Sequence, residues 1–158
     1  MKAASVKEIR DELKIYTPEQ LQELCLRLAR FKKENKELLT YLLFEAGDEQ
    51  AYIHGVQEEI DAGFAAINFR SIYLVKKSLR KILRDTNKYI RYSAVKTTEI
   101  DLLIYFCRKV RTSKIPLSKS LVLRNLYARQ VAKIEKLLAK MHEDIQFDYE
   151  DDITFLKA

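Results

Sequence analysis

Apolar residues recur every three or four positions along most of the chain, and this spacing predicts helices, because such residues share one helix face. An early run of this kind is Leu21, Leu24, Cys25, Leu28 and Phe31. A longer helix is expected over about residues 69–92, with an apolar face of Ile72, Val75, Leu79, Ile82 and Ile90. We expect each of these faces to pack against another helix.

Capping residues mark where the first two helices begin. Ser5 is followed three residues later by Glu8, and Thr17 in the same way by Gln20. In this arrangement each side chain bonds the backbone N–H of the other residue, which satisfies two donors that the helix leaves open. The sequence therefore predicts helices that start after Ser5 and after Thr17.

Further boundaries follow from glycine, aspartate and threonine. Gly47 is expected to end the third helix in a left-handed conformation, and Asp48 is expected to cap the fourth helix. Thr97 or Thr98 marks the start of a sixth helix, and a seventh is expected over about residues 118–142. The sequence thus predicts about seven helices.

Small residues and cysteines add two packing predictions. Ala51, Gly55 and Gly63 share a strip of the fourth helix, and small side chains there would let a neighbouring helix approach closely. Cys25 and Cys107 each lie in an apolar helical run. Free thiols are often buried, so we expect both cysteines to pack in the core.

The predicted fold class is all-α. The chain of 158 residues has only 3 glycines and 2 prolines, too few for the turns of a sheet protein. Short connections between helices favour antiparallel neighbours. We expect a single domain over residues 1–158 with an acidic C-terminal tail over residues 143–158, in which Ile153 to Leu156 dock on the body. The architecture is an antiparallel multi-helix bundle or a short, α-solenoid-like array of helical hairpins.

Charge is unevenly distributed along the chain. Residues 69–92 hold eight basic residues and one acidic residue, and residues 107–140 hold ten and one. The two ends are acidic, with net charges of −4 over residues 1–68 and −5 over residues 141–158. The middle of the chain is therefore the candidate for binding an anionic partner.

The basic residues of the helix over residues 69–92 are ordered at helical spacing. They form one strip: Arg70, Lys77, Lys81, Arg84, Lys88 and Arg91. The seventh helix adds further candidates for polyanion binding: Arg124, Arg129, Lys133, Lys136 and Lys140. Three aromatic rings of the basic helix are candidates for stacking on unpaired bases: Tyr73, Tyr89 and Tyr92.

Three interpretations of the strip compete. The first is a solvated face, partly neutralised by the acidic ends. The second is a surface that follows the phosphates of a nucleic acid, because Lys and Arg release condensed counterions there. The third is a site for an acidic protein, including another copy of this chain. Binding to a membrane surface ranks lower, because the basic helix lies mid-chain between helices that need it for packing.

No catalytic or metal motif accompanies these features. His54 and His142 are the only histidines, and neither stands in the Glu-x-x-His or His-x-x-x-His spacing of metal sites. There is no Cys-x-x-Cys and no Gly-rich phosphate loop. We expect no cofactor and no metal, and nothing supports an enzyme. Without a signal peptide or an apolar run long enough to span a bilayer, a cytoplasmic location is expected.

The run SVKEIRDELKIYTPEQLQELCLRLARFKKENKELLTYLLFE, residues 5–45, resembles the opening of an uncharacterised bacterial family of small all-helical proteins. The shared features are helix caps and leucine spacing. The resemblance implies an all-α fold, and it supplies no activity and no site residue. The functional hypothesis therefore remains a binding or scaffolding module, with nucleic acid or an acidic protein as partner.

Overall fold

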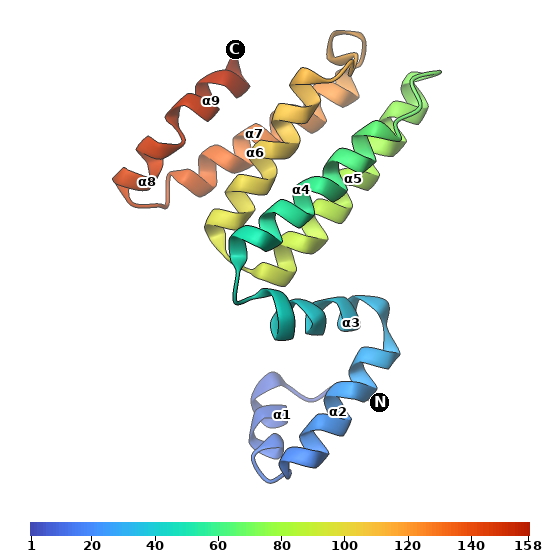
Figure 1. Ribbon diagram of the computed structural model, residues 1–158, viewed down its shortest axis with the longest axis vertical. Coiled ribbons are helices and arrows are strands. Elements are labelled where there is room, and N and C mark those ends of the chain that lie inside the picture. Colours follow the sequence, from blue (N-terminus) through green and yellow to red (C-terminus); the bar gives the residue numbers. More distant parts are fainter. The chain divides into compact units, whose positions relative to one another are not determined.

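A computed structural model describes residues 1–158 and confirms the all-α fold (Figure 1). A π-helical turn, Tyr41–Glu45, and a 3-10 turn, Leu117–Lys119, accompany the α-helices. The α-helices are α1 Val6–Leu13, α2 Pro18–Phe31, α3 Lys33–Thr40, α4 Glu49–Ala65, α5 Ile72–Ser93, α6 Lys96–Thr112, α7 Leu121–Leu138, α8 Glu143–Asp148 and α9 Glu150–Lys157.

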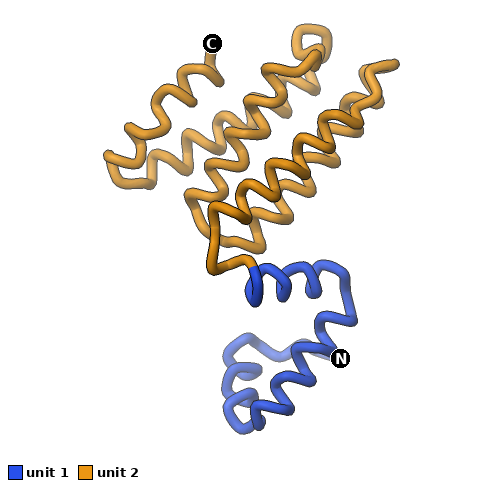
Figure 2. Tube along the Cα trace, viewed as in Figure 1, with its two compact units in different colours: residues 1–44 blue, residues 45–158 orange.

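The chain divides into two compact units, where the sequence predicted one domain (Figure 2). Unit 1 is Met1–Phe44 and holds α1 to α3. Unit 2 is Glu45–Ala158 and holds α4 to α9. No helix in either unit combines the length and apolar character needed to cross a lipid bilayer.

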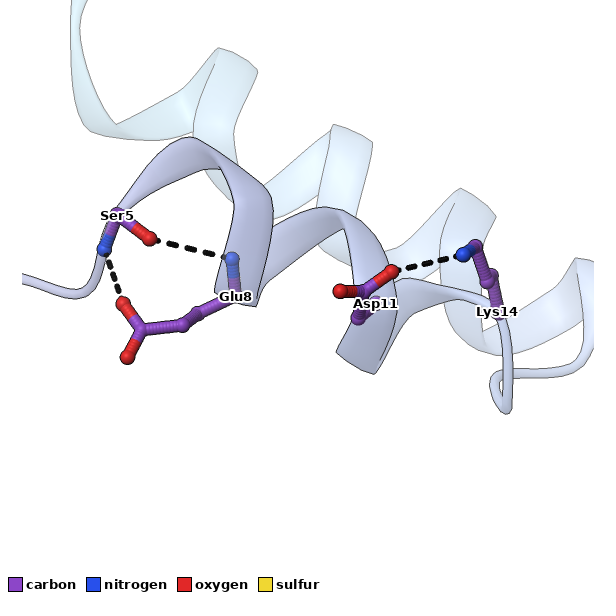
Figure 3. A network of polar contacts seen from close by, with 4 residues as sticks. All are labelled: Ser5, Glu8, Asp11 and Lys14. Carbon is purple, nitrogen blue, oxygen red and sulfur yellow. Dashed lines mark hydrogen bonds and ion pairs between the residues drawn. The ribbon is translucent and has the colours of Figure 1, made fainter.

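The predicted caps of unit 1 are confirmed. The Ser5 hydroxyl accepts from the Glu8 backbone N–H at 3.3 Å, and the Ser5 N–H donates to the Glu8 carboxylate at 2.7 Å (Figure 3). Hydrogen bonding to Ser5 lowers the pKa of the Glu8 carboxyl. Thr17 and Gln20 make the same reciprocal pair at the start of α2. Local chemistry thus sets where α1 and α2 begin.

Unit 2 is built from helical hairpins. The consecutive helices α4 and α5 pack together, as do α6 and α7, and α6 also contacts α4 and α5. Figure 1 shows α4 and α6 in one layer with α5 and α7 behind them. The final helix α9 packs against α6 and α7. Unit 2 is therefore a short two-layer array of hairpins, in which α5 and α7 share a layer.

The core of unit 2 is centred on α6. Five of its apolar side chains have no exposed surface: Ile100, Leu102, Leu103, Phe106 and Cys107. The Phe106 ring lies 5.7 Å from that of Phe64 on α4. Burial raises the pKa of the Cys107 thiol to about 12. The predicted burial of Cys107 is confirmed.

Polar side chains join the helices of unit 2 at defined points. The Glu49 carboxylate of α4 accepts from the Ser93 hydroxyl and, at 2.6 Å, from the Thr98 hydroxyl. Further along α4, the Asp61 carboxylate accepts from the Tyr105 hydroxyl at 2.9 Å. Because Ser93 ends α5 while Thr98 and Tyr105 belong to α6, these bonds fix α4 against both neighbours.

The acidic tail docks on unit 2, as predicted, and forms α8 and α9. Leu156 is buried, and its carbonyl accepts from the Tyr127 hydroxyl of α7 at 2.7 Å. The Asp152 carboxylate pairs with Arg108 of α6. The carboxylates of the tail are therefore directed partly at α6.

Three local predictions are wrong. Cys25 is exposed, because its face of α2 meets no buried layer. Gly47 is not left-handed; the left-handed residue that ends a helix is Ala94, with φ of 56° after α5. The basic helix begins at Ile72 rather than near residue 69, because Ser71 accepts from the Leu74 N–H and caps it there.

The close approach predicted for the small residues of α4 is found at one glycine. A Cβ at Gly63 would lie 2.8 Å from the Cγ1 of Ile82 on α5. At Gly55 a Cβ would meet nothing within 4 Å. Only Gly63 therefore lets α5 approach α4, and the prediction is wrong for Gly55.

Candidate polyanion-binding face

The sequence of α5 separates cations from apolar side chains around its axis. Val75, Leu79 and Ile82 are buried, and the positively charged side chains between them lie on the other side. Arg70 is exposed, but it precedes the helix in the turn after α4, where its N–H donates to the Asn68 side chain at 2.9 Å. The helical part of the strip thus begins at Lys77.

The cations of α5 are open to solvent and are not neutralised by the acidic tail. Lys77, Lys81 and Arg91 are exposed and make no ion pair. Arg84 lies 3.5 Å from Asp85, its neighbour on the same helix. Lys88 is half-buried, with its Nζ 4.8 Å from the centre of the Tyr89 ring. The strip is therefore not matched one-for-one by carboxylates from the termini.

Lys133 joins α7 to α6 and α5. Its Nζ lies 2.7 Å from the Glu99 carboxylate of α6 and 3.4 Å from the Asn87 Oδ1 of α5. This contact places α7 beside α5, in agreement with their shared layer in Figure 1. Lys133 is thus held by protein partners and is a positioning residue rather than an open cation.

Two further cations of α7 and one in the turn that follows it lie on the side of Lys133. Arg129, Lys136 and Lys140 stand four residues before, three after and seven after it, so they share its helix face. All three are exposed and make no ion pair. They extend the positive charge of α5 onto α7.

Arg124 lies on another side of α7. It stands nine residues before Lys133, which rotates it by about half a turn. It instead shares a side with Glu135, eleven residues later, and Glu135 pairs with Lys157 of α9 at 2.8 Å. Arg124 therefore faces the α9 side, and the structure does not bring it together with the other candidates.

Arg80 is a cation of this surface that the sequence analysis missed. It is exposed, makes no ion pair, and stands seven residues before Asn87. Arg84 and Arg91, three before and four after Asn87, share that side. Arg80 belongs to this surface because it shares the helix side of Asn87, which lies beside α7. Only the tertiary structure shows that Asn87 lies there. We define the basic face as Lys77, Arg80, Lys81, Arg84, Arg91, Arg129, Lys136 and Lys140.

The three candidate stacking tyrosines differ in exposure. Tyr73 is 68% exposed at the start of α5. Tyr89 is half-buried, with its ring 6.2 Å from that of Tyr92 in an edge-on contact. Tyr92 retains 9% exposure, so it has no free ring face, and its assignment as a stacking residue is wrong. Tyr73 is the open ring of the three.

Titratable groups elsewhere do not gather into a metal site. His54 lies 3.6 Å from Glu58, and His142 lies 3.3 Å from Asp144, all on the surface. The structure brings together no group of three or more His, Cys, Asp or Glu side chains that would hold a metal ion. The basic face is therefore the most distinctive cluster of charged groups in the molecule.

Comparison with known proteins adds no family or fold relationship: no protein-family model, curated protein or solved structure matches this chain. Function has to be inferred from the chemistry of the basic face. That chemistry is a set of guanidinium and ammonium groups on two adjacent helices.

Proposed function

We propose that unit 2 binds the phosphate backbone of nucleic acid through the basic face, without reading its sequence. The supporting observation is that seven exposed cations lie on two adjacent helices and an eighth, Lys140, lies in the turn after α7, and one of the eight, Arg84, has a carboxylate partner. Cations that neutralise phosphates release condensed counterions, and this release drives sequence-independent binding. The cations lie in one row along α5 and another along α7, and such rows can contact successive phosphates of a nucleic-acid backbone.

The open cations also carry an energetic argument. Arg80 with Arg84, and Lys77 with Lys81, stand one turn apart on α5. Like charges at this spacing repel by roughly 0.2–0.5 kcal/mol per pair. A bound polyanion offsets that repulsion. Binding therefore relieves an unfavourable interaction that is present in the free protein. Arg adds the option of bidentate contact with phosphate oxygens.

Tyr73 favours single-stranded nucleic acid as the partner. Its ring is exposed on the same helix as five cations of the basic face, and unpaired bases stack on such rings. Stacking of this kind contributes roughly 1–3 kcal/mol per base. Replacing Tyr73 by Ala should therefore weaken binding to a single strand but not to a duplex, whereas Tyr73→Phe should retain both.

A titration of labelled single-stranded and duplex DNA at two salt concentrations tests the proposal. The logarithm of the binding constant should fall with the logarithm of salt by roughly 0.7 per phosphate neutralised on a single strand and 0.9 on a duplex. Binding that stays undetectable at low salt would overturn the proposal.

A matched pair of charge reversals tests the location. Arg129→Glu/Lys136→Glu changes the basic face, whereas Lys119→Glu/Arg124→Glu changes the net charge equally on exposed positions outside it. We expect the first variant to bind about tenfold more weakly or worse, with a shallower salt dependence, and the second to change little. An equal loss in both variants would show that total charge, rather than this face, governs binding.

A further inference from the structure

Unit 1 carries an open groove between α2 and α3. The groove has a volume of about 720 Å³ and an apolar floor of Leu26, Leu39 and Leu43. Four cations line it: Arg30, Lys32, Lys33 and Lys36. Two of them, Lys32 and Lys36, make no ion pair. The groove thus combines an apolar floor with a positively charged rim.

The other two cations of the rim are only loosely paired. Arg30 lies 3.7 Å from Glu23, and Lys33 lies 3.5 Å from Glu37. Exposed pairs of this kind contribute roughly 0–1 kcal/mol, so an incoming carboxylate competes with them easily. At one end of the groove the Leu43 and Phe44 side chains are 64% and 79% exposed. These side chains are available to an apolar group that enters the groove.

Unit 2 displays a segment with the opposite character. Residues 143–152, which cover α8 and the start of α9, hold six acidic residues and no basic residue. Four of these carboxylates make no ion pair: Glu143, Asp148, Glu150 and Asp151. Among them Phe147 projects from α8 with 75% of its surface exposed. An exposed aromatic ring surrounded by carboxylates is the complement of an apolar groove surrounded by cations.

We propose that the groove of unit 1 binds the acidic α8 segment of a second copy of this chain, with the Phe147 ring on the apolar floor. Four cations in the groove face four unpaired carboxylates on the segment, so the charges are complementary in sign and number. Aromatic anchors that enter a pocket carry much of the energy of protein interfaces. Each copy offers one groove and one segment, so two copies can close into a dimer in which the groove–segment contact is made twice.

The apolar floor distinguishes this groove from the basic face of unit 2. A cation of the basic face can lie over an aromatic ring, but an apolar floor also buries that ring, and the groove of unit 1 supplies such a floor. The Phe147 ring therefore directs α8 to the groove of unit 1. The dimer contact and the nucleic-acid face use different residues, so one interaction can be lost without the other.

Sedimentation velocity of the full chain over a range of concentrations tests the proposal. The wild type should form a species of twice the 18.6 kDa chain mass. Phe147→Ala should raise the dissociation constant of that dimer about tenfold or more, because it removes a buried anchor. Phe69→Ala removes an exposed phenylalanine outside both surfaces and should leave the mass unchanged. A wild type that stays monomeric at all concentrations would overturn the proposal.

A charge exchange identifies the contacting surfaces. Lys32→Glu/Lys36→Glu and Asp148→Lys/Glu150→Lys should each weaken the dimer strongly, because each variant places like charges opposite one another at the changed positions in both contacts. An equal mixture of the two variants should form dimers again, since the reversed groove of one chain then meets the reversed segment of the other. Circular dichroism of each variant checks that its helices are retained.

Other outcomes of the charge exchange would contradict the proposed contact. Failure of the mixture to form dimers, with each variant monomeric by itself, would show that the two surfaces do not meet between copies and would overturn the proposal. Loss on reversing α8 alone, with the groove variant still dimeric, would show that α8 binds another surface. Retention of the dimer in both variants would exclude the contact. The Arg129→Glu/Lys136→Glu variant, which tests nucleic-acid binding, should keep the wild-type mass.

Discussion

Unit 1 and unit 2 are both built from helices with apolar residues at helical spacing, but they differ in what those helices bury. In unit 2 the buried side chains of α6 pack against α4, α5, α7 and α9. In unit 1 none of α1, α2 and α3 has a buried residue. A hydrophobic stripe therefore shows that a helix has a contact face, and whether that face is filled depends on the neighbours available.

The difference extends to the surfaces that we assign to each unit. The basic face of unit 2 lies on helices whose opposite sides are fixed in a packed core, so its cations are presented rigidly. The groove of unit 1 is made of apolar side chains that the unit leaves exposed. We infer that unit 2 offers a preformed electrostatic surface and that unit 1 gains apolar contacts from a partner.

A core truncation should give the largest difference between the units. Phe106→Ala removes a fully buried ring that packs on Phe64 and should lower the free energy of unfolding by about 3–5 kcal/mol. Leu28→Ala in α2, where the side chain is 60% exposed, should change it by less than about 0.5 kcal/mol. Chemical denaturation measures both. Equal losses would show that unit 1 has a core of its own.

The two glycines of α4 sharpen the account of close packing. Gly63→Ala places a methyl group against Ile82 and should destabilise unit 2 by about 1–3 kcal/mol. Gly55→Ala has open space and should stabilise α4 by about 0.5–1 kcal/mol, because alanine is the better helix former. Thermal unfolding compares the two. A stabilising Gly63→Ala would mean that α4 and α5 are not closely packed there.

The smallest expected change in stability concerns the contact between the docked tail and Asp101 of α6, and it depends on pH. Burial raises the pKa of Asp101, which accepts from the Tyr149 hydroxyl at 2.6 Å. A raised pKa in the folded state means that the protonated form is favoured. The stability from this group is therefore present at acidic pH and is lost as pH rises through the raised value. We expect Asp101→Asn to stabilise the protein by about 0.5 kcal/mol at pH 7.

That gain should shrink as the pH falls, because the wild-type carboxyl itself becomes protonated. The control is Asp11→Asn in unit 1, which removes an exposed ion pair with Lys14 and should be neutral or slightly destabilising. Thermal melts from pH 4 to pH 7 measure both variants. A gain from Asp101→Asn that is constant with pH would contradict the assigned cause.

Much of the fold follows from local chemistry that the sequence displays. The caps at Ser5, Thr17 and Asp48 form as predicted because each depends only on residues within one turn. Burial was harder to predict. Cys25 and Cys107 lie in similar apolar runs, yet one is exposed and the other is buried, because burial depends on helices distant in sequence.

The candidate site was likewise only partly predictable from the sequence. Helical spacing alone placed Lys77, Lys81 and Arg84 on one strip. The contact of Lys133 with Asn87 was needed to join α7 to α5, to add Arg80 and to separate Arg124. Similarly, a tyrosine's position on a basic helix did not reveal that Tyr92 packs inward. Residues on one helix are predictable together, whereas a face shared by two helices is not.

Chemical-shift mapping of the full chain during titration with a single-stranded oligonucleotide at low salt tests the central claim most directly, since it locates binding residue by residue. The account predicts perturbed backbone amides along α5 and α7, including those near Arg84 and Lys136, and unperturbed amides in α1. Shifts confined to unit 1, or no shifts at any ratio of oligonucleotide to protein, would contradict it.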